Sequence, residues 1–211
     1  MKKIIGLTGT YCAGKNHIAA ILEQRGLTVI DIDLLGHRAL ETEKNTVCAR
    51  FGEDIKNSDG MIDRRLLGQK VFGNPAELAA LEAIIHPVVD ILTEKWLSAH
   101  CDCGNCVINA ALLHKSSVFK RLDFIILVSA PFFTRLRRAR HRDRLSGVNL
   151  LARFARQRGF YPQYLSGKAD IYRVGNPGFA IEPGILSPAQ RRLNAKLESR
   201  IDEILKKEGI L

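Results

Sequence analysis

The chain has 211 residues, of which 46% are hydrophobic and 26% are charged. This composition is ordinary for a soluble domain with a substantial core and excludes disordered and fibrous proteins. Lysine and arginine number 32 against 22 acidic residues, which gives a formal charge of +10. We therefore expect a partner that carries negative charge, such as nucleotide phosphates, nucleic acid or an anionic membrane.

Membrane and secreted classes are disfavoured. No apolar run approaches the roughly 20 residues of a spanning helix, and the opening MKKIIGLTG lacks the features of a signal peptide. We expect a cytoplasmic protein with no membrane partner. The five cysteines are odd in number and three are clustered, so free thiols are expected rather than a disulfide framework.

The first elements form a β-α-β unit. A β-branched apolar run over 3–8 predicts a strand, and helical spacing over 17–24 predicts the helix that follows a glycine-containing loop. A second strand over 27–32 ends in Asp31 and Asp33. Such a unit predicts a parallel sheet and an α/β fold.

The rest of the chain continues this fold around a helical insertion. Residues 34–99 have helical periodicity, broken by turn signals at 58–60 and at Asn74-Pro75. After it we expect two buried strands, an arginine-dense helix, a short strand and a closing amphipathic helix, over 107–113, 124–128, 135–158, 169–174 and 186–205.

A phosphate-binding loop is the strongest motif. GTYCAGK at 9–15 fits G-x-x-x-x-G-K between a predicted strand and helix. Glycines let the backbone turn its N–H groups toward a polyphosphate, the helix N-terminus adds positive potential, and Lys15 reaches the β- and γ-phosphates. The alternative is a strand-to-helix turn that is merely rich in glycine. The residues expected to hold the nucleotide are Gly9, Thr10, Tyr11, Cys12, Ala13, Gly14, Lys15, Asn16 and His17.

The metal position of this loop departs from the usual pattern. The residue after the lysine is normally serine or threonine, whose hydroxyl binds Mg²⁺, but here it is Asn16. An amide oxygen can bind magnesium directly or through water, whereas the imidazole of His17 is a poor ligand. Asn16 is therefore the candidate Mg²⁺ ligand. The alternative is a protein with weakened metal binding or turnover, or one that is catalytically degenerate.

Five blocks occur in order along the chain. They are GLTGTYCAGKNHIA, VIDIDLLGHRAL, DGMIDRRLLGQKVFGNPAELAALEAIIHPVV, INAALL and ADIYRVGNPG. With them the chain resembles the dephospho-CoA kinase family over roughly residues 3–180. The resemblance implies transfer of the γ-phosphoryl group of the co-substrate ATP, with Mg²⁺, to the ribose 3′-hydroxyl of dephospho-CoA, the last step of coenzyme A synthesis.

The same resemblance implies a division of the chain. Residues 1–33 and 105–211 would form the P-loop kinase core, with an arginine-bearing lid at about 135–165. Residues 34–104 would form the helical domain that binds dephospho-CoA.

Several acceptor-side residues follow from the resemblance. Asp33 matches the second aspartate of the family's D-x-D and would accept the proton of the 3′-hydroxyl, with Asp31 beside it. The alternative is that both cap the next helix. Thr8 matches a threonine near the acceptor, although strand packing explains a threonine there equally well.

Three further residues belong to the acceptor side. Arg64 and Arg65 lie in the block resembling D-R-x-x-L, where an arginine contacts the acceptor, and alignment favours Arg64. His86, followed by Pro87, has either a substrate-side role or a structural role at a helix end.

The lid contributes arginines to the nucleotide side. Arg138 and Arg142 are four residues apart on one helical face, a spacing that lets both close over a triphosphate, and Arg142 matches the family's catalytic lid arginine. A solvated basic face is the alternative reading. Asn176 and Gly178 resemble the family's N-x-G near the adenine.

The chain also departs from the family after its third strand. The motif P-L-L-F-E, often with an acid two residues earlier, reads Ala111-Leu112-Leu113-His114-Lys115, with Asn109 at the acidic position. Ala111 and Lys115 leave the expected fold unchanged and put the rate in doubt. Another small-molecule P-loop kinase, or a weak nucleotide- or CoA-binding relative, remains an alternative.

The cysteines and the charge leave other possibilities. Cys101, Cys103 and Cys106 have C-x-C-x-x-C spacing without a second half, so a solvent-facing connection is favoured over a zinc site. Cys12, inside the loop, is a candidate for redox sensitivity. Nucleic-acid binding is disfavoured because Phe154 is the only aromatic residue within the arginine-dense stretch 135–158, too few for a stacking platform.

Overall fold

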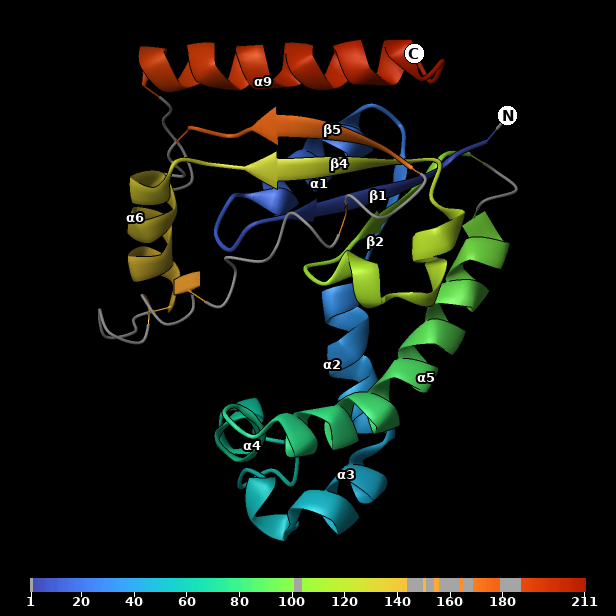
Figure 1. Cartoon of the computed structure of the whole chain (residues 1–211), viewed down its shortest axis with the longest axis vertical. Coiled ribbons are helices and arrows are strands. Elements are labelled where there is room, and N and C mark those ends of the chain that lie inside the picture. The colour runs from blue at the N-terminus through green and yellow to red at the C-terminus, as the bar shows by residue number, and fades with distance from the viewer. Residues whose placement is uncertain are drawn as a thin grey trace. The chain divides into compact units, whose positions relative to one another are not determined.

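The computed structural model describes residues 2–100, 104–143, 150, 154–155, 164, 169–178 and 187–211 (Figure 1). The chain forms two compact units. The first comprises Met1–Ile30 and His100–Leu211, and the second comprises Asp31–Ala99. Among the described residues, no helix is long and apolar enough to span a membrane.

The first unit is built on a five-stranded sheet with the order β2-β3-β1-β4-β5. Its strands are β1 (Ile4–Gly9), β2 (Thr28–Asp31), β3 (Cys106–Asn109), β4 (Phe124–Ser129) and β5 (Asp170–Gly175). β1 runs parallel to both neighbours, with Leu7 in register with Asn109 and Ile126. The predicted α/β fold with a parallel sheet is confirmed.

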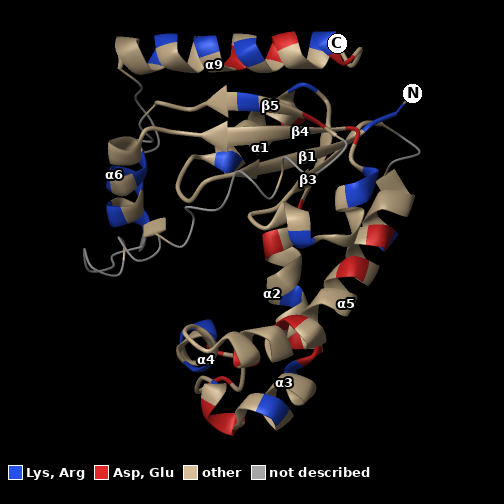
Figure 2. Ribbon diagram, in the orientation of Figure 1, with Lys and Arg blue, Asp and Glu red and all other residues tan. Residues whose placement is uncertain are grey.

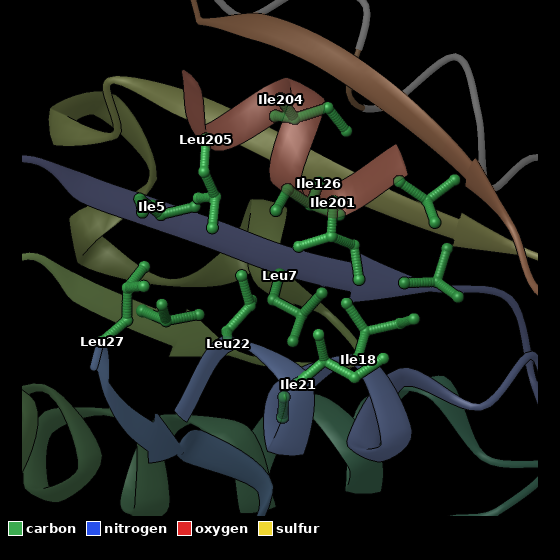
Figure 3. Packing of buried hydrophobic residues seen from close by; sticks show 14 of the residues in the cluster. Ile5, Leu7, Ile18, Ile21, Leu22, Leu27, Ile126, Ile201, Ile204 and Leu205 are labelled. Atoms are coloured by element: carbon green, nitrogen blue, oxygen red, sulfur yellow. The ribbon is translucent and has the colours of Figure 1, made fainter. Parts of the chain in front are cut away.

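Two helices cover one face of this sheet. They are α1 (Lys15–Gln24) and α9 (Pro188–Lys207), and Figure 3 shows their apolar side chains meeting those of β1 and β4. The fully buried members of this core include Ile5, Leu7, Ile18, Leu22, Ile126, Ile201 and Leu205. Burial of such side chains contributes about 1.5–3 kcal/mol each.

The predicted strand over 107–113 is too long. β3 ends at Asn109, and Leu113 belongs instead to the 3₁₀ turn η2 (Leu113–Lys115). Leu113 is fully buried whereas Leu112 is exposed, so this apolar stretch buries its side chains without extending the strand. A second 3₁₀ turn, η3 (Ser117–Arg121), leads to β4.

The arginine-dense stretch begins as α6 (Phe132–Asp143), three residues earlier than predicted. Figure 2 shows basic residues along this helix. The predicted continuation to residue 158 lies outside the described residues apart from positions 150, 154 and 155. Of the predicted lid beyond α6, only these positions and residue 164 are described.

The second unit is helical. Its helices are α2 (Ile32–Thr42), α3 (Lys44–Phe51), α4 (Arg64–Val71) and α5 (Pro75–His100), with the 3₁₀ turn η1 (Glu53–Ile55). Their buried apolar side chains, including Leu35, Ala39, Val47, Ile55 and Leu67, form its interior.

The turn signal at Asn74-Pro75 starts α5. The side-chain oxygen Oδ1 of Asn74 accepts hydrogen bonds from the backbone N–H groups of Ala76 at 3.1 Å and Glu77 at 3.3 Å. Pro75 takes the first helical position, where no N–H is needed. Pro87, by contrast, lies within the helix. The interpretation of His86 as a helix-end residue is therefore wrong.

Candidate active site

The loop between β1 and α1 leaves the sheet tightly. The Thr10 N–H donates to the Val128 carbonyl at 3.2 Å, and a Cβ on Gly9 would lie 2.8 Å from that oxygen. Glycine is required here because any side chain would collide with backbone of the neighbouring strand.

The end of the loop requires an unusual backbone. Cys12 has φ 58° and Gly14, which caps α1, has φ 90°. A residue other than glycine in this region stores strain of the kind found at ligand-binding sites. The Ala13 N–H closes the turn on the Thr10 carbonyl at 2.9 Å.

Two side chains hold the outer edge of this loop. Arg138 on α6 donates from Nη1 to the carbonyls of Cys12 at 3.3 Å and Ala13 at 2.9 Å. Asn176, just after β5, donates from Nδ2 to the same Ala13 oxygen at 3.0 Å. Because a trans peptide directs its two polar groups oppositely, the Gly14 N–H points away from these side chains. The loop thus presents N–H groups and the α1 N-terminus on one side, as anion binding requires.

Arg138 also joins the loop to the segment after β5. Its Nη2 donates to the backbone and side-chain oxygens of Asn176, both at 3.3 Å, and to the Gly178 carbonyl. Burial lowers the pKa of the Arg138 guanidinium, although arginine keeps its charge in proteins. Arg138 therefore lies in the predicted region, but its described bonds go to protein oxygens.

His17, in the first turn of α1, is held neutral near pH 7. Burial of part of its ring lowers the pKa of the imidazole, the charge of Arg138 lowers it further, and Glu198 opposes the shift. Lys15, the first residue of α1, thus supplies the cation that the motif places at the loop.

Arg142 lies against the same loop. Its guanidinium stacks 5.2 Å from the centre of the Tyr11 ring, a cation–π contact of about 0.5–1 kcal/mol. Tyr11 also meets Phe154 edge-on at 5.3 Å. The structure therefore brings both predicted lid arginines, one helical turn apart, to the phosphate loop.

Two amide side chains meet at the position where the sequence predicts a Mg²⁺ ligand. Asn109, at the end of β3, donates from Nδ2 to Oδ1 of Asn16 at 3.4 Å. A carbonyl oxygen has two lone pairs, so Oδ1 of Asn16 can accept this bond and also face a cation. Thr10 Oγ1 is buried and has no hydrogen-bond partner within the described part of the chain. Neutral oxygens of this kind could take part in holding a magnesium ion, which also accepts phosphate and water oxygens.

Thr8, the last residue but one of β1, is fully buried. Its hydroxyl lies 3.4 Å from the Ala111 carbonyl and 3.3 Å from the hydroxyl of Tyr164. Both partners belong to the protein, which favours the packing alternative over direct contact with an acceptor. Tyr164 could not be predicted from local sequence patterns, because 156 positions separate it from Thr8.

The second unit gathers a polar cluster at the start of α2. Asp31 caps this helix by accepting from the N–H groups of Asp33 at 2.9 Å and Leu34 at 3.4 Å. The capping alternative therefore describes Asp31, while Asp33 lies in the first turn with an exposed side chain.

His37 and Arg64 extend this cluster. Nη1 of Arg64 lies 2.6 Å from Nε2 and 3.0 Å from Nδ1 of His37. Partial burial lowers the pKa of His37, Arg64 lowers it further, and Asp33 and Asp31 oppose the shift. Sequence reasoning missed His37; the signal was its position one turn after Asp33.

The other two predicted acceptor-side residues are on α4 and α5. Arg65 is exposed and stands 3.9 Å from Asp63, the residue that caps α4. His86 is exposed on α5. The two neighbouring arginines therefore have different partners: Arg64 contacts His37, and Arg65 lies near Asp63.

The cysteine cluster is described in part. Cys101 and Cys103 lie outside the described residues, and Cys106 is buried in β3. No group of three or more metal-ligating side chains occurs among the residues that the structure describes.

Comparison with known proteins identifies the protein family that this chain matches. The model of the dephospho-CoA kinase family matches residues 3–160. The dephospho-CoA kinase of Treponema pallidum is 30% identical over 217 residues, covering 99% of this chain and 96% of that protein.

Solved structures agree with this match. The crystal structure of TT1252 from Thermus thermophilus superposes with a TM-score of 0.74 at 31% identity, covering 96% of this chain and 97% of that one. A dephospho-CoA kinase from Campylobacter jejuni, at 22% identity, shares the fold with a TM-score of 0.60 over 96% and 97% of the two chains. The chain therefore belongs to the dephospho-CoA kinase family and is an ATP-dependent kinase.

Proposed function

We propose that this chain transfers the γ-phosphoryl group of ATP to the ribose 3′-hydroxyl of dephospho-CoA, completing coenzyme A. The observation that carries the proposal is the phosphate loop itself. Arg138 and Asn176 occupy the Ala13 carbonyl, so the loop's opposite side and the start of α1 are available to an anion. Family membership supplies the acceptor.

The nucleotide side uses residues 9–17. Backbone N–H groups bind the phosphates, and Lys15 neutralises charge on the β- and γ-phosphates. Arg142 would leave the Tyr11 face to which it is stacked and bind the triphosphate. Asn176 would contribute on the adenine side, because it is anchored to the loop from the end of β5.

The acceptor side uses the helical unit. We assign the dephospho-CoA domain to residues 34–104 and the lid to about 135–165, as the family pattern implies. Arg64 would bind an acceptor phosphate, and the neutral His37 ring would hold its guanidinium without adding a competing charge. Arg65 is a secondary candidate because it lies beside Asp63 whereas Arg64 contacts His37. His86, on α5, is also a secondary candidate.

Phosphoryl transfer needs an oriented hydroxyl more than a strong base. The 3′-oxygen forms a bond to the γ-phosphorus while the bond from phosphorus to the β,γ-bridging oxygen breaks, and ADP leaves. Asp33 accepts the hydroxyl proton. Asp31 holds the backbone N–H of Asp33 and so fixes the first turn from which that carboxylate projects.

Mg²⁺ would be held by Asn16, with Asn109 beside it. When bound, it would neutralise phosphate charge during transfer. The two amides offer oxygens without negative charge, so the protein's own contribution to metal affinity is expected to be small.

We further propose that the protein works in the cytoplasm. A weak binder of nucleotide or CoA is the second candidate, because Asn16, Ala111 and Lys115 all depart from the family pattern. The test is purified protein with ATP, Mg²⁺ and dephospho-CoA, followed for CoA and ADP. Activity should fall by about 10²–10⁴-fold in Asp33→Asn and by about 10²–10³-fold in Lys15→Ala.

The outcomes separate the candidates. Formation of CoA and ADP in equal amounts by the wild-type protein, and loss of this activity in both variants, would support the kinase. Binding of dephospho-CoA with no ADP above the variants supports the weak binder. Phosphorylation of a different alcohol acceptor at a higher rate supports another small-molecule kinase.

A further inference from the structure

A buried tyrosine joins the carboxyl ends of β1 and β3. Tyr164 is fully buried, and its hydroxyl lies 3.3 Å from Oγ1 of Thr8 and 3.2 Å from Nδ1 of His114. Its ring meets the rings of His114 and Phe119 edge-on, with centroids 5.4 Å and 6.0 Å apart. A hydroxyl at such depth must be satisfied within the protein.

Proton counting gives these bonds a direction. The Ala111 carbonyl can only accept, so Thr8 uses its single hydroxyl proton there. The Tyr164 hydroxyl must then donate to Thr8, and His114 must donate from Nδ1 to Tyr164. The chain of donors runs from His114 through Tyr164 and Thr8 to Ala111.

This series of hydrogen bonds reaches the start of the phosphate loop. Thr8 immediately precedes Gly9, where the loop starts, and Ala111 follows β3. The Ala110 N–H donates to the Leu7 carbonyl at 3.0 Å, so backbone and side-chain bonds join the same two strand ends.

We propose that Tyr164 is a positioning residue for phosphoryl transfer, which fixes through Thr8 the point at which the phosphate loop leaves β1. The proposal rests on the proposed function only for its kinetic readout. A loop that starts from a loosened strand end still binds ATP, because its N–H groups and Lys15 remain. It aligns the γ-phosphate less well, and small misplacements cost rate more than affinity.

Tyr164→Phe tests this with a minimal change, since it keeps the ring and removes the hydroxyl. Tyr172→Phe is the matched control. The Tyr172 hydroxyl also bonds a distant side chain, Glu208, but this bond joins β5 to the C-terminal end of α9 and not to β1 or β3. We expect Tyr164→Phe to lower kcat by about tenfold to a hundredfold with the KM for ATP within about threefold, whereas Tyr172→Phe keeps kcat.

Thr8 provides a second route to the same bond. Thr8→Val should reproduce the loss, Thr8→Ser should restore most of it, and the double variant Tyr164→Phe/Thr8→Val should be no slower than the slower single variant. If the two losses multiply, the hydroxyls act independently and the proposal is wrong. If Tyr164→Phe does not fold, the Thr8 pair decides the question.

Hydrogen exchange separates this proposal from the proposed function. Without any substrate, amides of residues 9–16 should exchange about tenfold faster in Tyr164→Phe and unchanged in Tyr172→Phe. Equal exchange in both variants, or an unchanged kcat in Tyr164→Phe, overturns the proposal. A wild-type chain without kinase activity would overturn the proposed function, and exchange would still test the role of Tyr164.

Discussion

Arg138→Ala probes the link between α6 and the phosphate loop. The guanidinium donates to carbonyl oxygens of Cys12, Ala13, Asn176 and Gly178. A hydrogen bond from a charged donor contributes about 1.5–3 kcal/mol, and removing the side chain relieves the cost of partly burying its charge. We expect a net loss of about 2–4 kcal/mol in the free energy of unfolding.

Arg138→Ala should also bind ATP more weakly. Without Arg138 the Ala13 carbonyl keeps only its bond from Asn176 among those described here, so the peptide that directs the Gly14 N–H is less constrained. We expect the Kd for ATP to rise by about tenfold or more, which is about 1.4 kcal/mol. Arg138→Lys should recover part of this, since one ammonium cannot span all these acceptors.

Arg140→Ala is the matched control. Arg140 has the same charge on the same helix and is exposed, and an exposed substitution changes stability by about 0.5 kcal/mol or less. Urea unfolding and calorimetric titration with ATP measure both quantities. If Arg138→Ala were as stable and bound ATP as tightly as Arg140→Ala, Arg138 would not hold the loop.

Gly14→Ala should lose more ATP affinity than Gly26→Ala. Both glycines have positive φ, but a Cβ at Gly14 would lie 2.3 Å from Nδ2 of Asn176, whereas a Cβ at Gly26 would have no neighbour within 4 Å. Equal losses of affinity in a calorimetric titration would mean that backbone strain alone matters. Asn16→Ser should lower the Mg²⁺ concentration for half-maximal binding of Mg²⁺–ATP, measured by calorimetry; an unchanged value would show that Asn16 does not limit metal binding. Burial and a neighbouring arginine lower the pKa of His37, so the unfolded chain binds its proton more readily and stability falls as pH drops below about 6.5. His37→Gln should flatten that slope in urea unfolding, and an identical slope would contradict the assignment.

The phosphate loop could be predicted because its signal is local. Consecutive residues carry the motif, and the flanking strand and helix have clear periodicity. Even so, α1 begins at Lys15, two residues before the predicted start, because Gly14 in the left-handed region caps it. Composition and the β-α-β pattern likewise predicted the parallel sheet.

The partners of the loop could not be predicted from the sequence. Arg138 was expected over a triphosphate, and its spacing from Arg142 gave no sign that its bonds go to Ala13, 125 positions away. Tyr164 was missed for the same reason. Long-range hydrogen bonds depend on which strand ends meet, and hydrophobic periodicity does not encode that.

Boundaries failed where apolar residues are buried outside a strand or where proline lies inside a helix. Leu113 continues the apolar run of β3 but packs from a 3₁₀ turn. A helix end at His86-Pro87 was one of two alternatives, yet Pro87 lies inside the 26-residue helix α5.

The central claim is tested most directly by the position of the transferred phosphate. Dephospho-CoA, ATP and Mg²⁺ are incubated with the protein, and the product is examined by mass spectrometry and ³¹P NMR. The account predicts a phosphomonoester on the ribose 3′-oxygen, formed in equal amount to ADP. Release of inorganic phosphate without this product, or a phosphate on any other oxygen, would contradict it.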